Sequence, residues 1–391
     1  MVRTVGTTVR GIRTPIVKKG DDLVRIVVDS ILQSAAAEKY QLADRDVIGI
    51  TESLLARAQG NYATIEDVSW EVKGKFPGDI VVLFPLLSRN RFLPILEGIV
   101  KSGKRIYLIL QYPADEVGNS LLDVDLMDEL GINPCVDVLS EKEYRRLFGE
   151  RITHPFTGID YVQMYRDLAK DNRMVIYLSN NPKFALEFAG NILVANVHER
   201  KRTKRILEKA GAKGVLGLDD LFTGPVNNSG YNPEYGLLGS NKAGENKIKL
   251  FPRDSQSFVE EVQQMIKKKT GKHVEVLVYG DGAFKDPQSK IWELADPVVC
   301  PGYTSGLSGT PHEVKLKYIA DNELEHLPPA EAARALKKKI REQKENKESL
   351  GTTPRHLTDL LGSLCDLTSG SGDKGTPVVL IQGYFDNFAT E

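Results

Sequence analysis

The sequence predicts a mixed α/β fold (α+β mixed) that contains an inserted βαβ subdomain of Rossmann-like type. Apolar runs typical of buried strands alternate with segments of helical spacing in residues 46–112. A second series of such runs, again separated by helical segments, occupies residues 173–218. Because 391 residues are too many for one small core, the chain is expected to form more than one domain.

Residues 1–110 are predicted to form the N-terminal part of one domain. The stretch TTVRGIRTPIV is β-rich, and a turn precedes a helix whose apolar side chains recur at helical spacing from Leu23. The buried strand DVIGI then runs directly into a short helix that Gly60 closes. Two further strands, DIVVLFPLL and KRIYLILQY, flank the helical pattern of residues 92–100.

Residues 111–229 are predicted to form the inserted α/β subdomain. Its strands are RMVIYLSNN, NILVANV and KGVLGL, and the helices between them are NPKFALEFAG and ERKRTKRILEKAG. The second helix carries the basic cluster KRTKR opposite Ile206 and Leu207. Interspersed charge is typical of a solvated helix face, and this interpretation is favoured over a phosphate-binding patch.

Residues 230–391 are predicted to complete the first domain. The segment 223–247 is rich in Gly, Asn and Pro and is predicted to be an extended loop. A helix over residues 255–268 follows, and then the alternating apolar run VEVLVYGDGAF. The chain closes with a charged helix from Pro329, a helix over residues 354–367, a Gly-rich turn and the strand PVVLIQGYF.

The composition excludes several classes of protein. Lys plus Arg (52) balances Asp plus Glu (53), so no overall field attracts nucleic acid or an anionic membrane. The three cysteines show no CxxC or Cys/His ligand spacing, which argues against a disulfide scaffold and a structural zinc site. No apolar run approaches the ~20 residues that span a bilayer, and the N-terminus lacks an apolar signal core. We therefore expect a cytoplasmic protein.

Standard catalytic signatures are missing: GxxxxGK[ST], GxGxxG after a strand, HExxH and GxSxG do not occur. Asp281 follows the strand VEVLVYG, where an acidic side chain can coordinate Mg²⁺ at the end of a sheet. Asp-Gly is also common turn chemistry, and the pattern alone favours the turn. The Gly-rich residues 368–375 either expose backbone N–H groups to a phosphate or form a hairpin loop, and the pattern alone favours the loop.

Three segments, in this order, resemble the coenzyme F-420 glutamate ligase (F-420-0:L-glutamate or gamma-glutamyl ligase) family. They are RTPIVKKGDDLVRIV with LADRDVIGITESLLARAQGNY, then GLLGSNKAGENKIKLFPRDSQSFVEEVQQMIKKKTGKHVEVLVYGDGAF, and finally TPRHLTDLLGSLCDLTSGSGDKGTPVVLIQGY. The resemblance covers roughly residues 1–100 and 230–391 and leaves the middle without an equivalent. The chain therefore looks like an enlarged member of the family with an inserted middle region.

The resemblance implies the ligase-like fold and a reaction. In this family GTP activates a carboxylate as an acyl phosphate, which the amino group of glutamate attacks, and Mg²⁺ or Mn²⁺ supports the phosphates. The chain would then be a GTP- or ATP-dependent ligase of a small-molecule acceptor and an amino acid, similar to the enzyme of coenzyme F-420 biosynthesis, and a homodimer. The acceptor, including the deazaflavin precursor itself, and the role of the middle region stay open.

The resemblance also implies site residues, although it assigns no catalytic residue. Asp281 and Gly282 fall on metal-contacting positions of the family. The positions that contact the nucleotide are Arg13, Thr14, Pro15, Ile16, Glu52, Ser53, Arg57, Asn241, Thr368, Ser369, Gly370, Ser371 and Gly372.

The chain departs from the family pattern at the metal positions. Leu238 stands where the family's Gly-Ile-Asp-x-Ser-Asn loop has its aspartate, and Gly282 stands where the family has threonine. A noncatalytic nucleotide- or metabolite-binding homologue is therefore kept as an alternative, whereas the absence of a GxGxxG that follows a strand disfavours a dinucleotide-binding oxidoreductase. Carboxylates that could supply the lost ligand, among which the sequence does not choose, are Glu234, Glu245, Asp286, Asp296 and Glu313.

Overall fold

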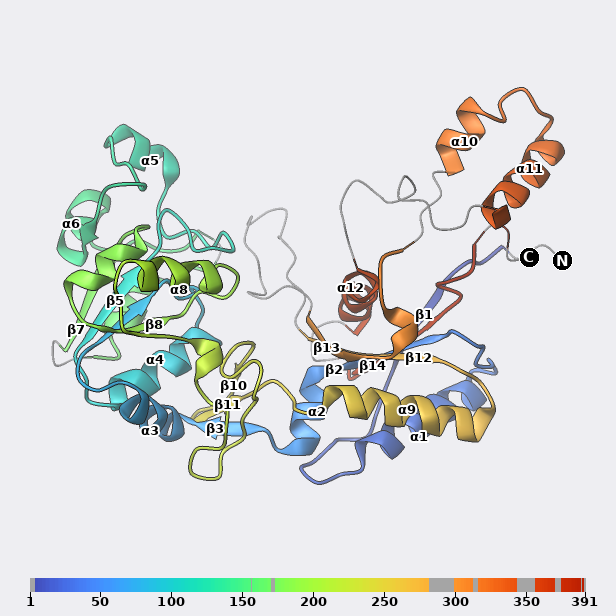
Figure 1. Cartoon of the computed structure of the whole chain (residues 1–391), viewed down its shortest axis with the longest axis horizontal. Helices are drawn as coiled ribbons and strands as arrows, with labels where there is room; N and C mark the ends of the chain where they lie inside the picture. Colours follow the sequence, from blue (N-terminus) through green and yellow to red (C-terminus); the bar gives the residue numbers. More distant parts are fainter. Residues whose placement is uncertain are drawn as a thin grey trace. The chain divides into compact units, whose positions relative to one another are not determined.

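The computed structural model describes residues 4–155, 157–169, 173–280, 299–311, 316–342, 356–369, 374–387 and 389. These residues form two compact units (Figure 1). The terminal unit contains the described residues within 4–55, 254–280 and 299–389, and the middle unit contains those within 56–253. Each unit has its own main sheet and helices, so the predicted mixed α/β fold is confirmed.

The structure divides the chain at other positions than the predicted 110/111 and 229/230. Both of these positions fall inside the middle unit. The reason is that β4 (Ile80–Leu83) and β5 (Ile106–Leu110) pair with each other and with strands further along the chain, β8 (Asn191–Val194) and β7 (Met174–Leu178). The middle unit therefore takes up residues that were predicted to belong to the N-terminal part.

The main sheet of the terminal unit (the terminal sheet) has the strand order β1-β14-β2-β12-β13. Its strands are β1 (Thr8–Ile12), β14 (Val378–Gln382), β2 (Val47–Thr51), β12 (Glu275–Gly280) and β13 (Val299–Tyr303). β2 and β12 are parallel, and β14 runs antiparallel to both β1 and β2. Consequently β1, β2 and β12 all end at one edge, which we name the carboxyl edge of the terminal sheet.

Helices cover both faces of the terminal sheet. Figure 1 shows α1 (Leu23–Ala37) and α9 (Ser255–Thr270) on one face and α12 (Leu357–Ser369) on the other. The α12 face is packed by Leu361 and Cys365 against Leu277 and other buried strand residues. α1 begins at Asp22, whose side chain accepts a hydrogen bond from the Arg25 N–H. The remaining helices are η3 (Ser305–Leu307), α10 (Leu316–Asn322) and α11 (Pro329–Glu342).

The main sheet of the middle unit (the middle sheet) has the order β6-β7-β5-β4-β8-β9. β9 (Gly214–Gly217) and the four strands β7, β5, β4 and β8 are parallel, whereas β6 (Leu139–Ser140) is antiparallel. Taken in chain order, the parallel strands lie 3-2-1-4-5 across the sheet, which is the order of doubly wound nucleotide-binding folds. The order reverses between β4 and β8, and this is the topological switch point.

Two cores flank the middle sheet. The larger one holds residues of α3 (Ile65–Lys75), α4 (Phe92–Lys101), α6 (Glu141–Phe148) and α7 (Tyr161–Arg166). The smaller one, on the other face, holds Ala185 of η1 (Pro182–Glu187) and Leu207 of α8 (Arg200–Lys209). The other helical segments of the unit are α5 (Val124–Glu129), η1 (Pro182–Glu187), α8 (Arg200–Lys209) and η2 (Leu218–Asp220). The segment NPKFALEFAG thus forms a 3₁₀ helix.

A small sheet completes the middle unit. It joins β3 (Tyr62–Thr64), β11 (Lys247–Lys249) and β10 (Asn241–Gly244) in antiparallel pairs. The predicted extended loop 223–247 is therefore irregular only up to Ser240, after which the chain forms a short hairpin. α2 (Glu52–Gln59) begins in the terminal unit and ends in the middle unit. No helix in the described ranges combines the length and the apolarity that crossing a membrane requires.

Candidate functional site

The strand register brings three separate segments of the chain to the carboxyl edge of the terminal sheet. Ile12 pairs with Val378, Val378 with Ile50, and Ile50 with Val278. The residues that follow β1 and β2, beginning with Arg13 and Glu52, therefore leave the sheet on the same side. The carboxyl ends of parallel strands are the usual place for a ligand in an open α/β sheet.

The first segment, Arg13–Ile16, contains a positively charged side chain that is exposed to solvent. Arg13 is exposed and makes no ion pair with the described residues. Thr14 is half-buried, Pro15 is exposed and Ile16 is 83% exposed, while the next residue, Val17, is anchored in the core. An exposed guanidinium beside open backbone is suited to contact a phosphate group.

The end of α12 supplies another segment to this edge. The Thr376 hydroxyl donates to the Ser369 carbonyl over 3.1 Å, which holds the last turn of α12 against the start of β14. The Thr368 and Ser369 hydroxyls donate to the carbonyls of Leu364 (2.6 Å) and Asp366 (3.0 Å). Gly370, Ser371 and Gly372 lie outside the described residues, as do Asp281 and Gly282.

Tyr279, the penultimate residue of β12, lies near Glu52 and the end of α12. Burial raises the pKa of the Tyr279 hydroxyl, Cys365, Asp366 and Glu52 raise it further, and the Ser369 hydroxyl lowers it. These groups therefore lie within electrostatic range of one another. Glu52 is 1% exposed, so its carboxyl group belongs to the interior of this edge.

The structure brings some predicted nucleotide-binding residues together at the carboxyl edge of the terminal sheet and assigns two others to the middle unit. The described residues Arg13, Thr14, Pro15, Ile16, Glu52, Ser53, Thr368 and Ser369 all belong to the carboxyl edge of the terminal sheet. Arg57, which is exposed about one helical turn after Ser53 on α2, belongs to the middle unit. Asn241, at the start of β10, also belongs to the middle unit.

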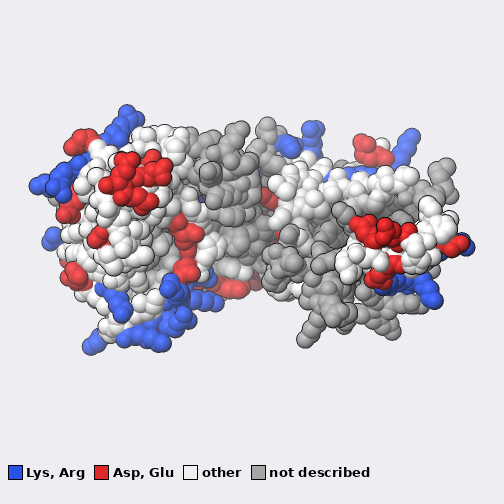
Figure 2. All heavy atoms as spheres, turned by 90° about the horizontal axis from the view of Figure 1, so that it is seen from above, with Lys and Arg blue, Asp and Glu red and all other residues white. Residues whose placement is uncertain are grey.

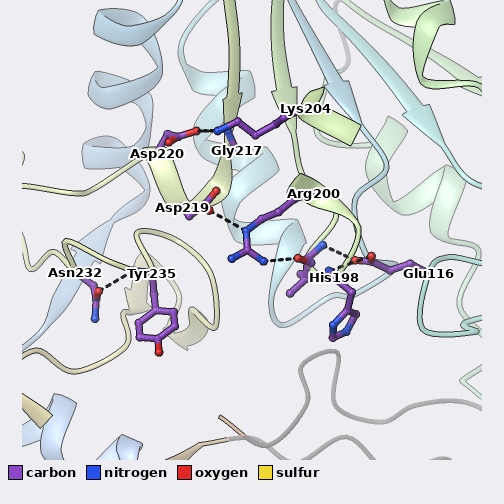
Figure 3. Close-up of polar contacts among 10 residues, drawn as sticks. Glu116, His198, Arg200, Lys204, Gly217, Asp219, Asp220, Asn232 and Tyr235 are labelled. Carbon is purple, nitrogen blue, oxygen red and sulfur yellow. Dashed lines mark hydrogen bonds and ion pairs between the residues drawn. The ribbon is translucent and has the colours of Figure 1, made fainter. Parts of the chain in front are cut away.

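Leu238, at the position of the expected aspartate, is a core residue of the middle unit. Its side chain is 5% exposed and packs in the larger core. The backbone around it is fixed, because Gly236 has φ 54° and a Cβ at that position would overlap the Leu221 carbonyl oxygen. The Asn232 side chain holds the same loop, since its Oδ1 accepts from the Tyr235 N–H over 2.8 Å (Figure 3). A metal ligand is excluded at this position.

The described residues do not fit a divalent metal ion. No group of three or more His, Cys, Asp or Glu side chains in the described ranges is arranged to hold one. Glu234 and Glu245 are exposed on the loop and the hairpin, and Asp286, Asp296 and Glu313 lie outside the described ranges. Neither Glu234 nor Glu245 belongs to a group of three such side chains within the part of the chain that the structure describes.

A second group of polar residues lies at the carboxyl edge of the middle sheet, the edge where β4, β5, β7, β8 and β9 end. Glu116, which follows β5, accepts hydrogen bonds from the backbone N–H groups of Val197, His198 (3.1 Å) and Glu199 (3.0 Å) at the start of α8 (Figure 3). The N-cap residue of α8 makes no side-chain cap of its own. Glu116 therefore neutralises the positive end of this helix. The sequence analysis missed it, because one acidic residue in a loop carries no recognisable signal.

The basic cluster of α8 is a surface face, as predicted. Lys201, Arg202 and Arg205 are exposed, and Lys204 pairs with Asp220 over 2.5 Å. Arg200 donates to Asp219 over 2.8 Å, which ties the first turn of α8 to η2 (Figure 3). On the face of the molecule shown in Figure 2, small groups of basic and acidic side chains are interspersed.

A cavity of about 30 Å³ lies at the same carboxyl edge of the middle sheet. It is lined by Leu86 beyond β4, by Ala195 and Val197 beyond β8, and by residues of the loop that contains Leu238 and Ser240. The sequence analysis identified this loop only through the resemblance and did not predict a cavity. Its signal, the apolar pair Leu237 and Leu238 between two glycines, is not specific.

The comparisons with known proteins agree with the resemblance. The family described as F420-0:Gamma-glutamyl ligase matches residues 11–383. The matched range includes the middle region, for which we expected no equivalent in the family. A comparison with curated proteins gives no match. Since the match extends over nearly the whole chain, the protein belongs to the F420-0:Gamma-glutamyl ligase family.

Proposed function

We propose that this protein is a nucleotide-dependent amide ligase that joins L-glutamate, or a related amino acid, to a carboxylated small-molecule acceptor. Membership of the family gives a gamma-glutamyl ligase-type function in general. The use of GTP (or ATP) and an acyl phosphate intermediate are the specific parts of the proposal.

One observation supports the proposed nucleotide site above all others. Three segments that are separate in sequence, Arg13–Ile16, Glu52–Ser53 and Thr368–Ser369, meet at the carboxyl edge of the terminal sheet. These are the segments that the resemblance assigns to the nucleotide. Arg13 supplies an exposed positive charge for the phosphates, whereas the Thr368 and Ser369 hydroxyls donate to the carbonyls of Leu364 and Asp366.

The reaction requires activation because a carboxylate is a poor electrophile. An oxygen of the acceptor carboxylate attacks the γ-phosphorus of the nucleotide, the bond to the β-phosphate oxygen breaks, and the nucleoside diphosphate leaves. The amino nitrogen of glutamate then attacks the acyl carbon and loses a proton, and inorganic phosphate leaves with the carboxylate oxygen. The protein contributes alignment of the reacting groups and neutralisation of the phosphate charge.

Dependence on Mg²⁺ or Mn²⁺ is a separate part of the proposal and depends on Asp281. The described residues offer no ligand set, and Leu238 removes one expected ligand. The steps above are therefore written without a metal ion. An Asp281→Asn variant tests this part: we expect weaker Mg²⁺-dependent GTP binding with an unchanged melting temperature. Unchanged metal affinity would refute the assignment of Asp281.

The test of the ligase is a phosphate-release assay with purified protein, GTP or ATP, Mg²⁺ or Mn²⁺, glutamate and a panel of carboxylic acid acceptors. The proposal expects release that requires both the amino acid and an acceptor, together with a product whose mass equals the sum of the two minus water. Nucleotide binding without turnover across the panel would instead identify a noncatalytic nucleotide-binding homologue.

Leu238 is the observation that favours this second candidate, because a core leucine stands where the resemblance to the family places a metal-binding carboxylate. A third candidate is a dinucleotide-binding oxidoreductase, whose strand order the middle sheet has. However, the turn after β4, residues 84–91, contains no glycine that would let pyrophosphate approach the backbone closely. A homodimer belongs to the first proposal and is tested by light scattering of the purified protein.

A further inference from the structure

We propose that the protein pairs with a second copy of itself through two surfaces of opposite charge. One surface is residues 123–137 of the middle unit, which we name the acidic segment, and the other is the basic helix α11 of the terminal unit. In the pair, α11 of one copy lies on the acidic segment of its partner. The inference goes beyond the proposed ligase reaction and does not depend on it.

The acidic segment, which consists of α5 and the loop after it, leaves several large apolar side chains in water. Met127 is buried and anchors the helix, whereas Val124 is 50% and Val136 is 72% exposed, and Leu126 and Leu130 are exposed as well. A single exposed apolar residue is ordinary, but a group of them in one short segment is typical of an interaction surface.

The charge of the acidic segment selects the kind of partner. The segment contains five Asp or Glu residues and no Lys or Arg. Asp125, Asp128 and Glu129 are exposed and make no ion pair with the described residues. Such a surface repels nucleic acid and anionic lipid, and it attracts a cationic protein surface.

α11 is a cationic helix with an apolar stripe. Residues 329–342 contain five Lys or Arg against two Glu. Ala332, Leu336 and Ile340 recur every four residues and therefore lie on one side of the helix. α11 packs beside α10 (Figure 1), but none of the side chains of residues 329–340 is buried. Since an amphipathic helix is stabilised mainly by burial of its apolar face, this stripe needs a further surface.

The two surfaces complement each other. An amphipathic helix lays its apolar stripe on an apolar surface, and the Lys and Arg residues beside the stripe then meet the carboxylates of the acidic segment. Each copy of the chain carries both surfaces. A twofold pair therefore makes the same contact twice and leaves neither surface open.

Cross-linking from the acidic segment tests which residues contact it. Cys135 lies in this segment and is exposed, whereas Cys300 is half-buried and Cys365 is buried. A thiol-reactive photo-crosslinker therefore attaches at Cys135 of the full-length protein. We expect mass spectrometry of mixed ¹⁴N- and ¹⁵N-labelled copies to find cross-links from Cys135 to residues 329–342 of the other isotope. Such cross-links within one isotope only would overturn the pairing of two copies.

Charge reversal tests the electrostatic part by sedimentation equilibrium. Asp125→Lys with Glu129→Lys reverses charge on the acidic segment, and Arg334→Glu with Lys338→Glu reverses it on α11. Each double variant alone should associate at least about 10-fold more weakly than the wild type, because like charges then face each other. An equimolar mixture of the two double variants should regain association, because opposite charges face each other again. Unchanged melting temperatures show that the variants fold.

Glu187→Lys is the matched control, since Glu187 is exposed in η1 of the middle unit and lies outside the acidic segment. It should change association by no more than about 2-fold. A monomeric wild type at about 100 μM, or a mixture that does not regain association, would overturn the inference. A dimer that neither double variant weakens would overturn this contact and leave the ligase proposal intact. Pairing as described, in a protein without ligase activity, would overturn the ligase proposal alone.

Discussion

At the scale of single residues, Gly49 shows how closely α12 packs against the strand that leads to the candidate nucleotide site. It lies in the middle of β2, and a Cβ at that position would overlap the Sγ of Cys365 on α12. Cys365 is fully buried, and burial raises the pKa of its thiol. The absence of a side chain at position 49 lets α12 approach β2, the strand that leads into Glu52.

We expect Gly49→Ala to destabilise the protein by about 1–3 kcal/mol, because an added methyl group overpacks a fully buried contact. Urea denaturation followed by circular dichroism measures this change. The matched control is Gly74→Ala, at an exposed position of α3 where a Cβ meets nothing within 4 Å. The control should be neutral or stabilising by up to about 1 kcal/mol. Equal effects of the two substitutions would contradict the packing described here.

Asp115 is a deeply buried carboxyl group in the loop after β5. Its Oδ2 accepts from Leu87 N–H (2.9 Å) and Asn119 Nδ2 (2.8 Å), and its Oδ1 accepts from Val117 N–H (3.1 Å) and Asn119 N–H (2.9 Å). Burial raises the pKa of Asp115 from 3.8 to about 6, although these hydrogen bonds oppose the rise. The folded protein therefore holds a proton at Asp115 that the unfolded chain loses above pH 3.8.

The sign of the pH dependence follows from this rise. The contribution of protonated Asp115 to stability is fully present below pH 3.8 and is lost as the pH rises through about 6. A ¹³C NMR titration of the carboxyl groups should give Asp115 a midpoint of about 6. Exposed Glu66, whose pKa hydrogen bonds from Lys101 and Asn246 lower to about 2, provides the opposite control. A midpoint for Asp115 near 4 would contradict the burial described here.

The sequence could show that Leu238 stands where the family pattern has an aspartate, but it could not show where the leucine side chain packs. The resemblance predicted only that a metal ligand was missing. The structure shows the leucine packed in a core and lining a cavity, which depends on residues from β4, β8 and η2 that the local sequence does not specify. Glu116 could not be predicted for a similar reason, since its partners are backbone groups about 80 residues further along the chain.

At the scale of elements, α8 depends on a residue outside the helix. The N–H groups of the three residues just before its first turn, 197–199, all donate to the Glu116 carboxylate, while the first turn itself carries the basic residues Arg200, Lys201 and Arg202. Cations at the N-terminus oppose the helix dipole, so the helix start needs the carboxylate for both hydrogen bonding and charge.

Glu116→Gln should therefore destabilise the start of α8 by about 1–2 kcal/mol. Amide hydrogen exchange of residues 197–205 measures this directly, and the exchange rates should rise by about 5- to 30-fold. Glu199→Gln serves as the control, because it removes a carboxylate of the same region that only pairs with the largely exposed Arg202. The control should change stability by no more than about 0.5 kcal/mol. Exchange that is unchanged in Glu116→Gln would contradict the capping role.

Element types were predictable where the spacing of apolar residues was regular. The runs that form β2, β4, β5, β7, β8 and β14, and the helices α1 and α9, have the periodicity of their observed structures. NPKFALEFAG was predicted as an ordinary helix and forms the 3₁₀ segment η1, after a cap by the Asn181 side chain. The β10 strand was missed because its residues are polar and largely exposed, so no alternation marks it.

At the scale of the whole molecule, pairing between distant strands decides the organisation. Local spacing suggested that β4 and β5 continue the N-terminal part, but they complete the middle sheet with β7 and β8. The sequence contains no local signal for this choice, because strand order depends on tertiary packing. The family match across residues 11–383 includes both units.

The pairing of strands in the terminal sheet likewise brings the residues of the proposed nucleotide site together. Its three strands β1, β2 and β12 end at one edge, and the first two deliver Arg13 and Glu52 to that edge. The resemblance could name these residues, but only the register of the sheet shows that they meet. The proposal that this edge binds the nucleotide is the central claim about the protein.

Isothermal titration calorimetry with GTP in the presence of Mg²⁺ tests this claim most directly, on the wild type, Arg13→Gln and Lys18→Gln. Both variants lose one exposed positive charge of the same segment, and only Arg13 belongs to the candidate site. We predict that Arg13→Gln weakens GTP binding at least about 10-fold, the loss of one charged contact, and that Lys18→Gln stays within about 2-fold of the wild type. Absence of GTP binding by the wild type, or equal affinities of the two variants, would contradict the account.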